Sequence, residues 1–214
     1  MVRPAAVVFD LDGTLIDSRR DITTAINRMR AELGLPPLAL EQVVTMVGEG
    51  ARRLIERALP ERPDQVDQAL SRYLEHYWEV CLDTTRPYSG ITELLAALAG
   101  RYPLALLSNK GEALSRRILD GLGLSSYFRE ILGGDSLATR KPDPTGVRLL
   151  AERLKTPAER LLLVGDTWID AETARNAGCA FALVEWGFPR PSKLDDVKAD
   201  LRAATAGELA AALT

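Results

Sequence analysis

The stretch AAVVFDLDGT, residues 5–14, decides the fold. Its first half, Ala5 to Phe9, is a continuous apolar run without alternation, which is typical of a strand buried on both faces of a parallel sheet. Its second half places Asp10 and Asp12 directly after that strand. Similar short apolar runs recur further along the chain and predict further strands. They are Leu104 to Leu107, Leu161 to Val164, Phe181 to Val184 and, more weakly, Ile131 to Leu132.

Helical patterns separate these strands. Apolar residues recur at i, i+3 and i+4 within residues 91–98, 114–122, 147–154 and 171–177. Strands that alternate with helices predict an open α/β fold with a parallel, Rossmann-like sheet. We therefore expect the carboxyl ends of the strands to meet at one edge, where ligands bind in such sheets.

The interval between the first two strong strands is too long for one crossover. It spans roughly ninety residues, and its apolar stripes, at residues 22–33, 42–46, 54–59 and 66–81, are helical only. We interpret it as an inserted helical bundle of residues 16–86, which leaves residues 1–15 and 87–214 as the α/β core domain. The alternative is that these helices simply pack on the sheet.

Composition excludes several function classes. The chain has 214 residues, 46% of them hydrophobic, and a net charge of −3, which argues against a nucleic-acid binder. No apolar run approaches the roughly 18 residues of a membrane span, and Asp10 and Asp12 interrupt the first run too early for a leader. Cys81 and Cys179 make no disulfide framework. We therefore expect a cytoplasmic protein without a membrane or nucleic-acid partner.

His76 is the only histidine, so the chain has no pair of histidines for a zinc hydrolase, and a Ser-His-Asp triad would have to use this residue. It lies off the apolar stripe of residues 66–81, so we expect an ordinary solvated side chain. The chain also lacks a phosphate-binding P-loop and a complete dinucleotide fingerprint.

Polar residues end each strong strand. They are Asp10 and Asp12, then Ser108 and Asn109, then Asp166 and Asp170. Four carboxylates at one sheet edge repel one another unless a cation offsets them, and oxygen ligands without His or Cys suit Mg²⁺. Lys141, just before a predicted helix, adds a positive charge. Carboxylates, a magnesium ion, a lysine and fixed donors together favour phosphoryl transfer.

These four segments resemble the signatures of the haloacid dehalogenase superfamily. Residues 10–15, DLDGTL, resemble the first signature, and Ser108-Asn109, Lys141 and the Gly165-to-Asp170 segment resemble the second, third and fourth, in the same order. The resemblance spans nearly the whole chain. The predicted insertion also begins where this family places a helical cap.

The resemblance implies a mechanism. Asp10 would be the nucleophile that forms an aspartyl-phosphate, and Asp12 would protonate the leaving alcohol and then activate water. Mg²⁺ would contact Asp10, the backbone carbonyl of Asp12, and Asp166, with Asp170 at the metal or next to it. Asp170 could instead cap the helix that begins near it.

The same resemblance gives further roles. Ser108 and Asn109 would bind the phosphoryl oxygens, and Lys141 would hold nucleophile and phosphate together. The presence of Asp12 favours phosphate esters over halogenated acids, and the absence of lysine from residues 17–87 disfavours phosphonoacetaldehyde hydrolysis.

The predicted cap should set the substrate. Gly48, Gly50 and Arg52 could form a substrate-binding loop, because glycine admits close backbone approach and arginine binds carboxylates; a plain helix–helix turn is the alternative. This loop, PYSG at residues 87–90 and SNK at residues 108–110 are similar to phosphoglycolate phosphatases. Ser108, where those enzymes usually have threonine, and Trp168-Ile169 depart from that pattern. We expect a small-molecule phosphate ester as substrate, and a monomer or a homodimer.

Two other functions remain open at this point. A β-phosphoglucomutase-like phosphotransferase would use the same nucleophile, but the cap loop lacks the Thr-His lead-in that we expect of it. A non-enzymatic phospho-switch or scaffold would hold a phosphate without turnover. Receiver domains of that kind are shorter, however, and carry the phosphorylated aspartate after a later strand.

Overall fold

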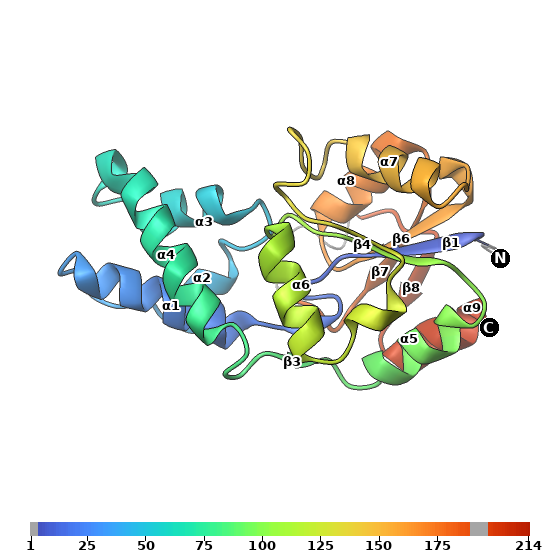
Figure 1. The fold of residues 1–214 in the computed structure, drawn as a ribbon, viewed down its shortest axis with the longest axis horizontal. Coiled ribbons are helices and arrows are strands. Elements are labelled where there is room, and N and C mark those ends of the chain that lie inside the picture. The colour runs from blue at the N-terminus through green and yellow to red at the C-terminus, as the bar shows by residue number, and fades with distance from the viewer. Residues whose placement is uncertain (1–3, 189–196) are drawn as a thin grey trace.

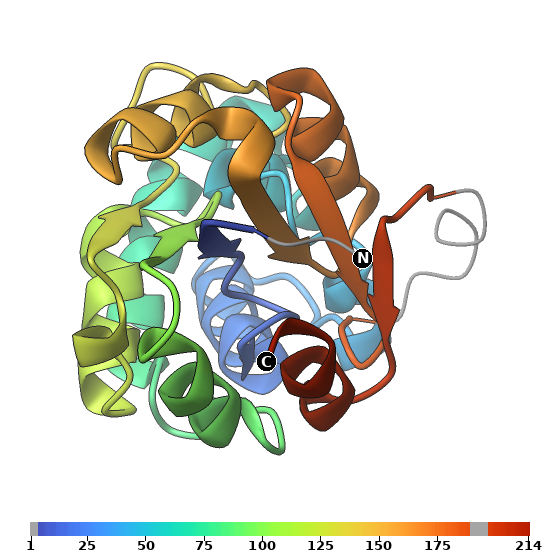
Figure 2. The same ribbon diagram turned by 90° about the vertical axis from the view of Figure 1, so that its right-hand side faces the viewer.

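The computed structural model describes residues 4–188 and 197–214 and contains a six-stranded sheet that is parallel throughout, in the order β5-β4-β1-β6-β7-β8 (Figures 1 and 2). The strands of this sheet are β1 (Ala6–Phe9), β4 (Leu104–Leu107), β5 (Glu130–Leu132), β6 (Leu161–Gly165), β7 (Ala180–Val184) and β8 (Leu201–Ala203). The α-helices are α1 (Arg19–Glu32), α2 (Leu40–Val44), α3 (Ala51–Ala58), α4 (Val66–Val80), α5 (Ile91–Ala99), α6 (Glu112–Gly121), α7 (Thr145–Arg153), α8 (Trp168–Ala177) and α9 (Ala206–Leu213). Short 3₁₀ turns cover Pro63–Gln65, Ser125–Tyr127 and Ala158–Arg160.

Helices cover both faces of the sheet. Val7 and Phe9 of β1 point into a core shared with α5, α6 and α9, whereas Ala6 and Val8 point into a second core with α7 and α8. Figures 1 and 2 show α7 and α8 on one side of the sheet and α5 and α9 on the other. Because both faces are buried, every position of β1 is apolar, and the α/β fold with a parallel sheet is confirmed.

The strand predictions fall on β1, β4, β5, β6 and β7. Three strands were not predicted: β8, which has three residues and lies at the sheet edge, and the antiparallel pair β2 (Ile16–Asp17) and β3 (Arg86–Pro87). Each has two or three residues, one of them charged, so it lacks the apolar run that identified the others.

Helices α1 to α4 lie together beside the carboxyl end of the sheet, and α1 and α4 pack side by side (Figure 1). The β2–β3 pair joins the two chain segments that lead to and from these helices. Asp21 secures the same junction, since its buried carboxylate accepts hydrogen bonds from the backbone and hydroxyl groups of Thr84 and Thr85. The division at residues 16–86 into a separate cap domain stays a prediction.

The predicted helix over residues 66–81 is α4, but its apolar stripe is not buried throughout. Leu74, which follows the stripe, is 42% exposed, and Trp78 is 44% exposed. Tyr73 and Tyr77 are buried, as the periodicity predicts. Leu74 instead lies at a cavity, which is described below.

No helix within the described residues, 4–188 and 197–214, combines the length and the apolar character that a membrane span requires.

Candidate active site

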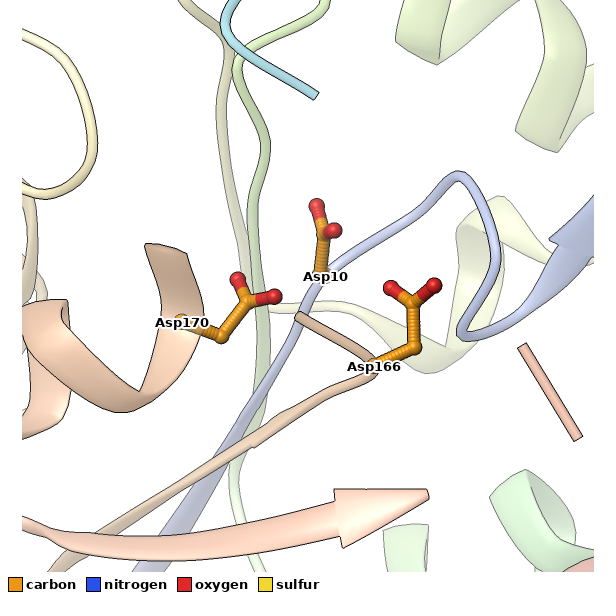
Figure 3. Close-up of side chains that lie close together, drawn as sticks. All are labelled: Asp10, Asp166 and Asp170. Atoms are coloured by element: carbon orange, nitrogen blue, oxygen red, sulfur yellow. The ribbon is translucent and has the colours of Figure 1, made fainter. Parts of the chain in front are cut away.

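Three buried carboxylates meet at the carboxyl end of β1 and β6. Asp10 follows β1, Asp166 follows β6 and Asp170 lies in the first turn of α8 (Figure 3). One oxygen of each lies within 4.8 Å of the others, and the side chains point toward the same space. Such a set of oxygen ligands is suited to a hard divalent cation.

The backbone packs closely around the carboxylate of Asp166. Gly13 has φ of +84°, and a Cβ there would lie 2.2 Å from Oδ2 of Asp166. Thr14 Oγ1 donates to Oδ1 of Asp166 at 3.3 Å, and the Phe188 N–H donates to its Oδ2 at 3.0 Å. Asp166 is therefore oriented by the loop that follows β1 and by the segment that follows β7.

Asp170 has two roles in the structure. Its Oδ2 accepts the backbone N–H of Thr167 at 3.2 Å and the Thr167 hydroxyl at 2.7 Å, which caps α8. Its Oδ1 lies 2.7 Å from Nζ of Lys141. The two interpretations of Asp170, helix cap and site residue, are thus compatible.

Lys141 bridges Asp10 and Asp170. Its Nζ lies 2.8 Å from Oδ1 of Asp10, and the side chain is 3% exposed. Burial raises the pKa of Asp10 to about 6, against the lowering effect of the Lys141 ammonium. Burial also opposes the charge on Lys141, but the two carboxylates outweigh it and raise the pKa of Lys141 above its ordinary value. One ammonium group beside three carboxylates leaves a negative excess, which a bound Mg²⁺ ion would offset.

Asp12 belongs to a different set of contacts. Its carboxylate is outside the three-carboxylate cluster. Its Oδ1 accepts from the Ser18 hydroxyl and, at 2.8 Å, from Nζ of Lys110. The same Nζ donates to the Tyr77 hydroxyl at 2.5 Å. Asp12 is therefore oriented by Ser18 and Lys110, on the side of the cavity that Tyr77 of α4 lines, while Asp10 lines the same cavity.

A cavity lies between the sheet edge and helices α1, α3 and α4. It has a volume of about 60 Å³. Its floor contains the polar groups Asp10, Asp12, Ser108, Asn109, Lys110, Lys141 and Thr167. Its apolar lining includes Ile22, Val47, Ala51, Leu54, Tyr73, Leu74, Tyr77, Leu114, Ile169 and Phe188.

Both residues that were predicted to bind the phosphoryl oxygens, Ser108 and Asn109, line this cavity. Asn109 donates through Nδ2 to the carbonyl of Gly48 at 2.9 Å and to that of Lys141 at 3.0 Å. Its buried Oδ1 has no hydrogen-bond partner among the described residues. The Gly48 contact ties the loop before α3 to the end of β4.

In the predicted substrate-binding loop, the glycines line the cavity and Arg52 does not. Gly48 and Gly50 line the cavity, and Gly50 has φ of +90°. Arg52 is absent from the lining; its Nη1 pairs with Asp67 at 2.6 Å and its Nε lies 3.7 Å from Glu56. The structure thus brings the backbone of the loop to the site while the Arg52 guanidinium is paired on the surface of the helices.

Three further residues at the site were not predicted from the sequence. Ser18 and Lys110 contact Asp12, and Tyr77 contacts Lys110. The position of Lys110 directly after Ser108 and Asn109 could have identified it, whereas Tyr77 was one of the apolar positions of the predicted helix. His76 lies outside the cavity lining, with Nε2 2.8 Å from Oε1 of Glu32.

Comparisons with known proteins agree with this geometry. Residues 7–184 match the family profile of haloacid dehalogenase-like hydrolases. The chain is 41% identical over 197 residues to a phosphoglycolate phosphatase of Rhodospirillum rubrum, with 87% of this chain and 82% of that protein covered. It is 41% identical over 183 residues to one of Aquifex aeolicus, with 85% of each covered.

A solved structure is also close. The crystal structure of a predicted phosphoglycolate phosphatase from Haemophilus somnus superposes with a TM-score of 0.90 at 28% identity. The match covers 98% of this chain and 97% of that one.

Proposed function

Because this chain belongs to the haloacid dehalogenase-like hydrolases and is a hydrolase of phosphate monoesters, we propose that its substrate is phosphoglycolate. The observation that carries the proposal is the buried cluster of Asp10, Asp166 and Asp170 with Lys141 at the floor of a small cavity. A volume of about 60 Å³ suits a leaving group of a few heavy atoms. The relatives named phosphoglycolate phosphatases support the choice of substrate.

The nucleophile in this proposal is Asp10. An oxygen of its carboxylate forms a bond to phosphorus while the bond from phosphorus to the alcohol oxygen breaks, which gives an aspartyl-phosphate. Lys141, 2.8 Å from Asp10, holds the carboxylate in place and faces the phosphoryl charge. Ser108 and Asn109 supply further polar contacts at the same end of the cavity.

Asp12 is the proton-transfer group. It donates a proton to the departing alkoxide and then takes one from the water that attacks phosphorus, which regenerates the Asp10 carboxylate. Its position outside the carboxylate cluster, on the side of α4, suits contact with the leaving group.

The donor set fits Mg²⁺. Asp10, Asp166 and Asp170 are the side chains that would hold it, together with the backbone carbonyl of Asp12, and the negative excess of the cluster favours a divalent cation. The ion supplies positive charge against the phosphoryl oxygens when bound.

We also propose that residues 16–86 act as a cap domain that closes over the site and selects the substrate. The contact from Asn109 to Gly48 and the apolar lining contributed by α1, α3 and α4 support this assignment.

The experiment is a kinetic screen with Mg²⁺ of phosphorylated metabolites, with phosphate release as the readout. We expect the highest kcat/KM for phosphoglycolate. A higher value for sugar phosphates would reject that substrate, and isomerisation of a sugar phosphate without net phosphate release would indicate the phosphotransferase alternative. A stable phosphoprotein without turnover would indicate a phospho-switch.

A further inference from the structure

Lys110 is a buried cation that the mechanism above leaves without a task. It lies between β4 and α6, and its side chain is 7% exposed. Nζ lies 2.8 Å from Oδ1 of Asp12 and 2.5 Å from the hydroxyl oxygen of Tyr77. It also lies 4.5 Å from the centre of the Tyr77 ring. Burying an ammonium group carries a large desolvation cost, so its position at the cavity floor calls for a reason.

The positive charges at the cavity are few. Among the described residues that line it, the cationic side chains are Lys110 and Lys141. Lys141 is committed to Asp10 and Asp170. The nearby arginines of α3 face other carboxylates, since Arg52 pairs with Asp67 and Arg57 with Glu49. Lys141 is paired with two carboxylates and Lys110 with one, so of these two lysines Lys110 keeps more positive charge for a second anionic group of a substrate.

The donors of Lys110 are not exhausted. An ammonium group carries three N–H donors, of which Asp12 and Tyr77 take two. Among the described residues the Lys110 ammonium group has no third acceptor, and Lys110 lines the cavity. The hydroxyl of Tyr77 holds the ammonium group from the side of α4.

The geometry also fixes which anionic group Lys110 can reach. In the proposed function, the leaving oxygen must lie against Asp12. In phosphoglycolate the carboxyl group is bonded to the carbon that bears this oxygen, so the carboxylate lies beside Asp12. Nζ of Lys110 is in contact with Asp12, so a substrate carboxylate beside Asp12 lies within reach of the ammonium group.

We propose that Lys110 is a specificity-determining residue that binds the carboxylate of the leaving group. This inference rests on the proposed function. It assigns selectivity for a 2-phospho acid to a lysine of the sheet edge, held by a tyrosine of α4, and not to the arginines of the helical region.

The test compares phosphoglycolate with ethyl phosphate, which has the same two-carbon skeleton but no carboxylate. In Lys110→Met we expect both substrates to react more slowly, because Asp12 loses its partner. The ratio of kcat/KM for phosphoglycolate over ethyl phosphate should fall about 100-fold, the usual scale for losing one partner of a buried charge pair. Lys110→Arg should retain most of the ratio.

Controls separate this role from folding. Lys155, an exposed lysine just before β6 and so at the opposite end of that strand from Asp166, gives the matched variant Lys155→Met, which should leave the ratio unchanged. Thermal unfolding of Lys110→Met should stay cooperative. As a second readout, inhibition of ethyl phosphate hydrolysis by glycolate should weaken at least about tenfold in Lys110→Met.

The outcomes are distinguishable. Equal losses for both substrates, with glycolate inhibition intact, would overturn the inference while the proposed function stands. A wild-type enzyme that does not prefer phosphoglycolate over ethyl phosphate would overturn the proposed function, and the role of Lys110 with it.

Discussion

The two sides of the cavity are built differently. On the sheet edge, each carboxylate is fixed by several partners: Asp166 by Thr14 and Phe188, and Asp170 by Thr167 and Lys141. The side formed by α1, α3 and α4 is largely apolar, and its arginines pair with surface carboxylates. The polar groups that line the cavity thus belong mainly to the sheet edge, while helices α1, α3 and α4 contribute mainly apolar side chains.

The strongest test of this division is Asp10→Asn. The amide cannot act as a nucleophile, so we expect kcat for every phosphate ester to fall on the order of 10⁴-fold or more. Steady-state phosphate release measures the effect, and circular dichroism should show an unchanged fold. A loss confined to phosphoglycolate would mean that Asp10 serves recognition and not the chemical step.

Gly13→Ala tests the rigidity of the floor. The new Cβ would lie 2.2 Å from Asp166 Oδ2 at φ of +84°, so Asp166 must shift. We expect Mg²⁺ affinity to fall about 10–100-fold, as when metal-site support is removed. The matched control in the helical region is Gly34→Ala, where φ is +69° but no atom lies within 4 Å. Calorimetric Mg²⁺ titrations should show unchanged affinity for the control; equal losses would mean that backbone strain alone is responsible.

The pH dependence of metal binding sharpens the contrast further. Burial raises the pKa of Asp10 to about 6, so the carboxylate is ionised above that pH and increasingly protonated below it. A proton on Asp10 competes with Mg²⁺, and the apparent Kd should rise about tenfold per pH unit below 6. Titrations between pH 4.5 and 7.5 measure this. Asp10→Asn should flatten the dependence; an unchanged slope in that variant would assign the proton to another group.

The smallest effect is expected from Arg52→Ala. Its guanidinium pairs with Asp67, itself exposed, and is absent from the cavity lining. Exposed ion pairs contribute little, so stability should change by less than about 1 kcal/mol. We expect kcat/KM for phosphoglycolate to stay within about threefold. A loss comparable to that of Lys110→Met would move the recognition of the carboxylate to helices α1, α3 and α4.

The sequence predicted the positions of the residues at the sheet edge better than the contacts of helices α1, α3 and α4. The apolar runs before Asp10 and Asp166 identified both the strands and the edge at which these aspartates meet, because parallel strands align their carboxyl ends. Strand β8 was not predicted, because a run of three residues, Leu-Arg-Ala, is too short to carry a periodic signal.

The contacts of these helices depend on competition between side chains, which spacing does not reveal. Arg52 was expected to face the substrate, but Asp67 and Glu56 lie within its reach. The contact between Lys110 and Asp12 joins residues that are 98 positions apart in the sequence. Leu74 follows the helical period of α4 and yet is 42% exposed and lines the cavity.

The central claim is that Asp10 carries the phosphoryl group, and the stereochemistry at phosphorus tests it most directly. A chiral ¹⁸O-labelled thiophosphate ester of glycolate, hydrolysed in H₂¹⁷O, yields inorganic thiophosphate of measurable configuration. Transfer to Asp10 and then to water comprises two in-line displacements, so the account predicts net retention. Net inversion would show direct attack by water and contradict an aspartyl-phosphate on Asp10.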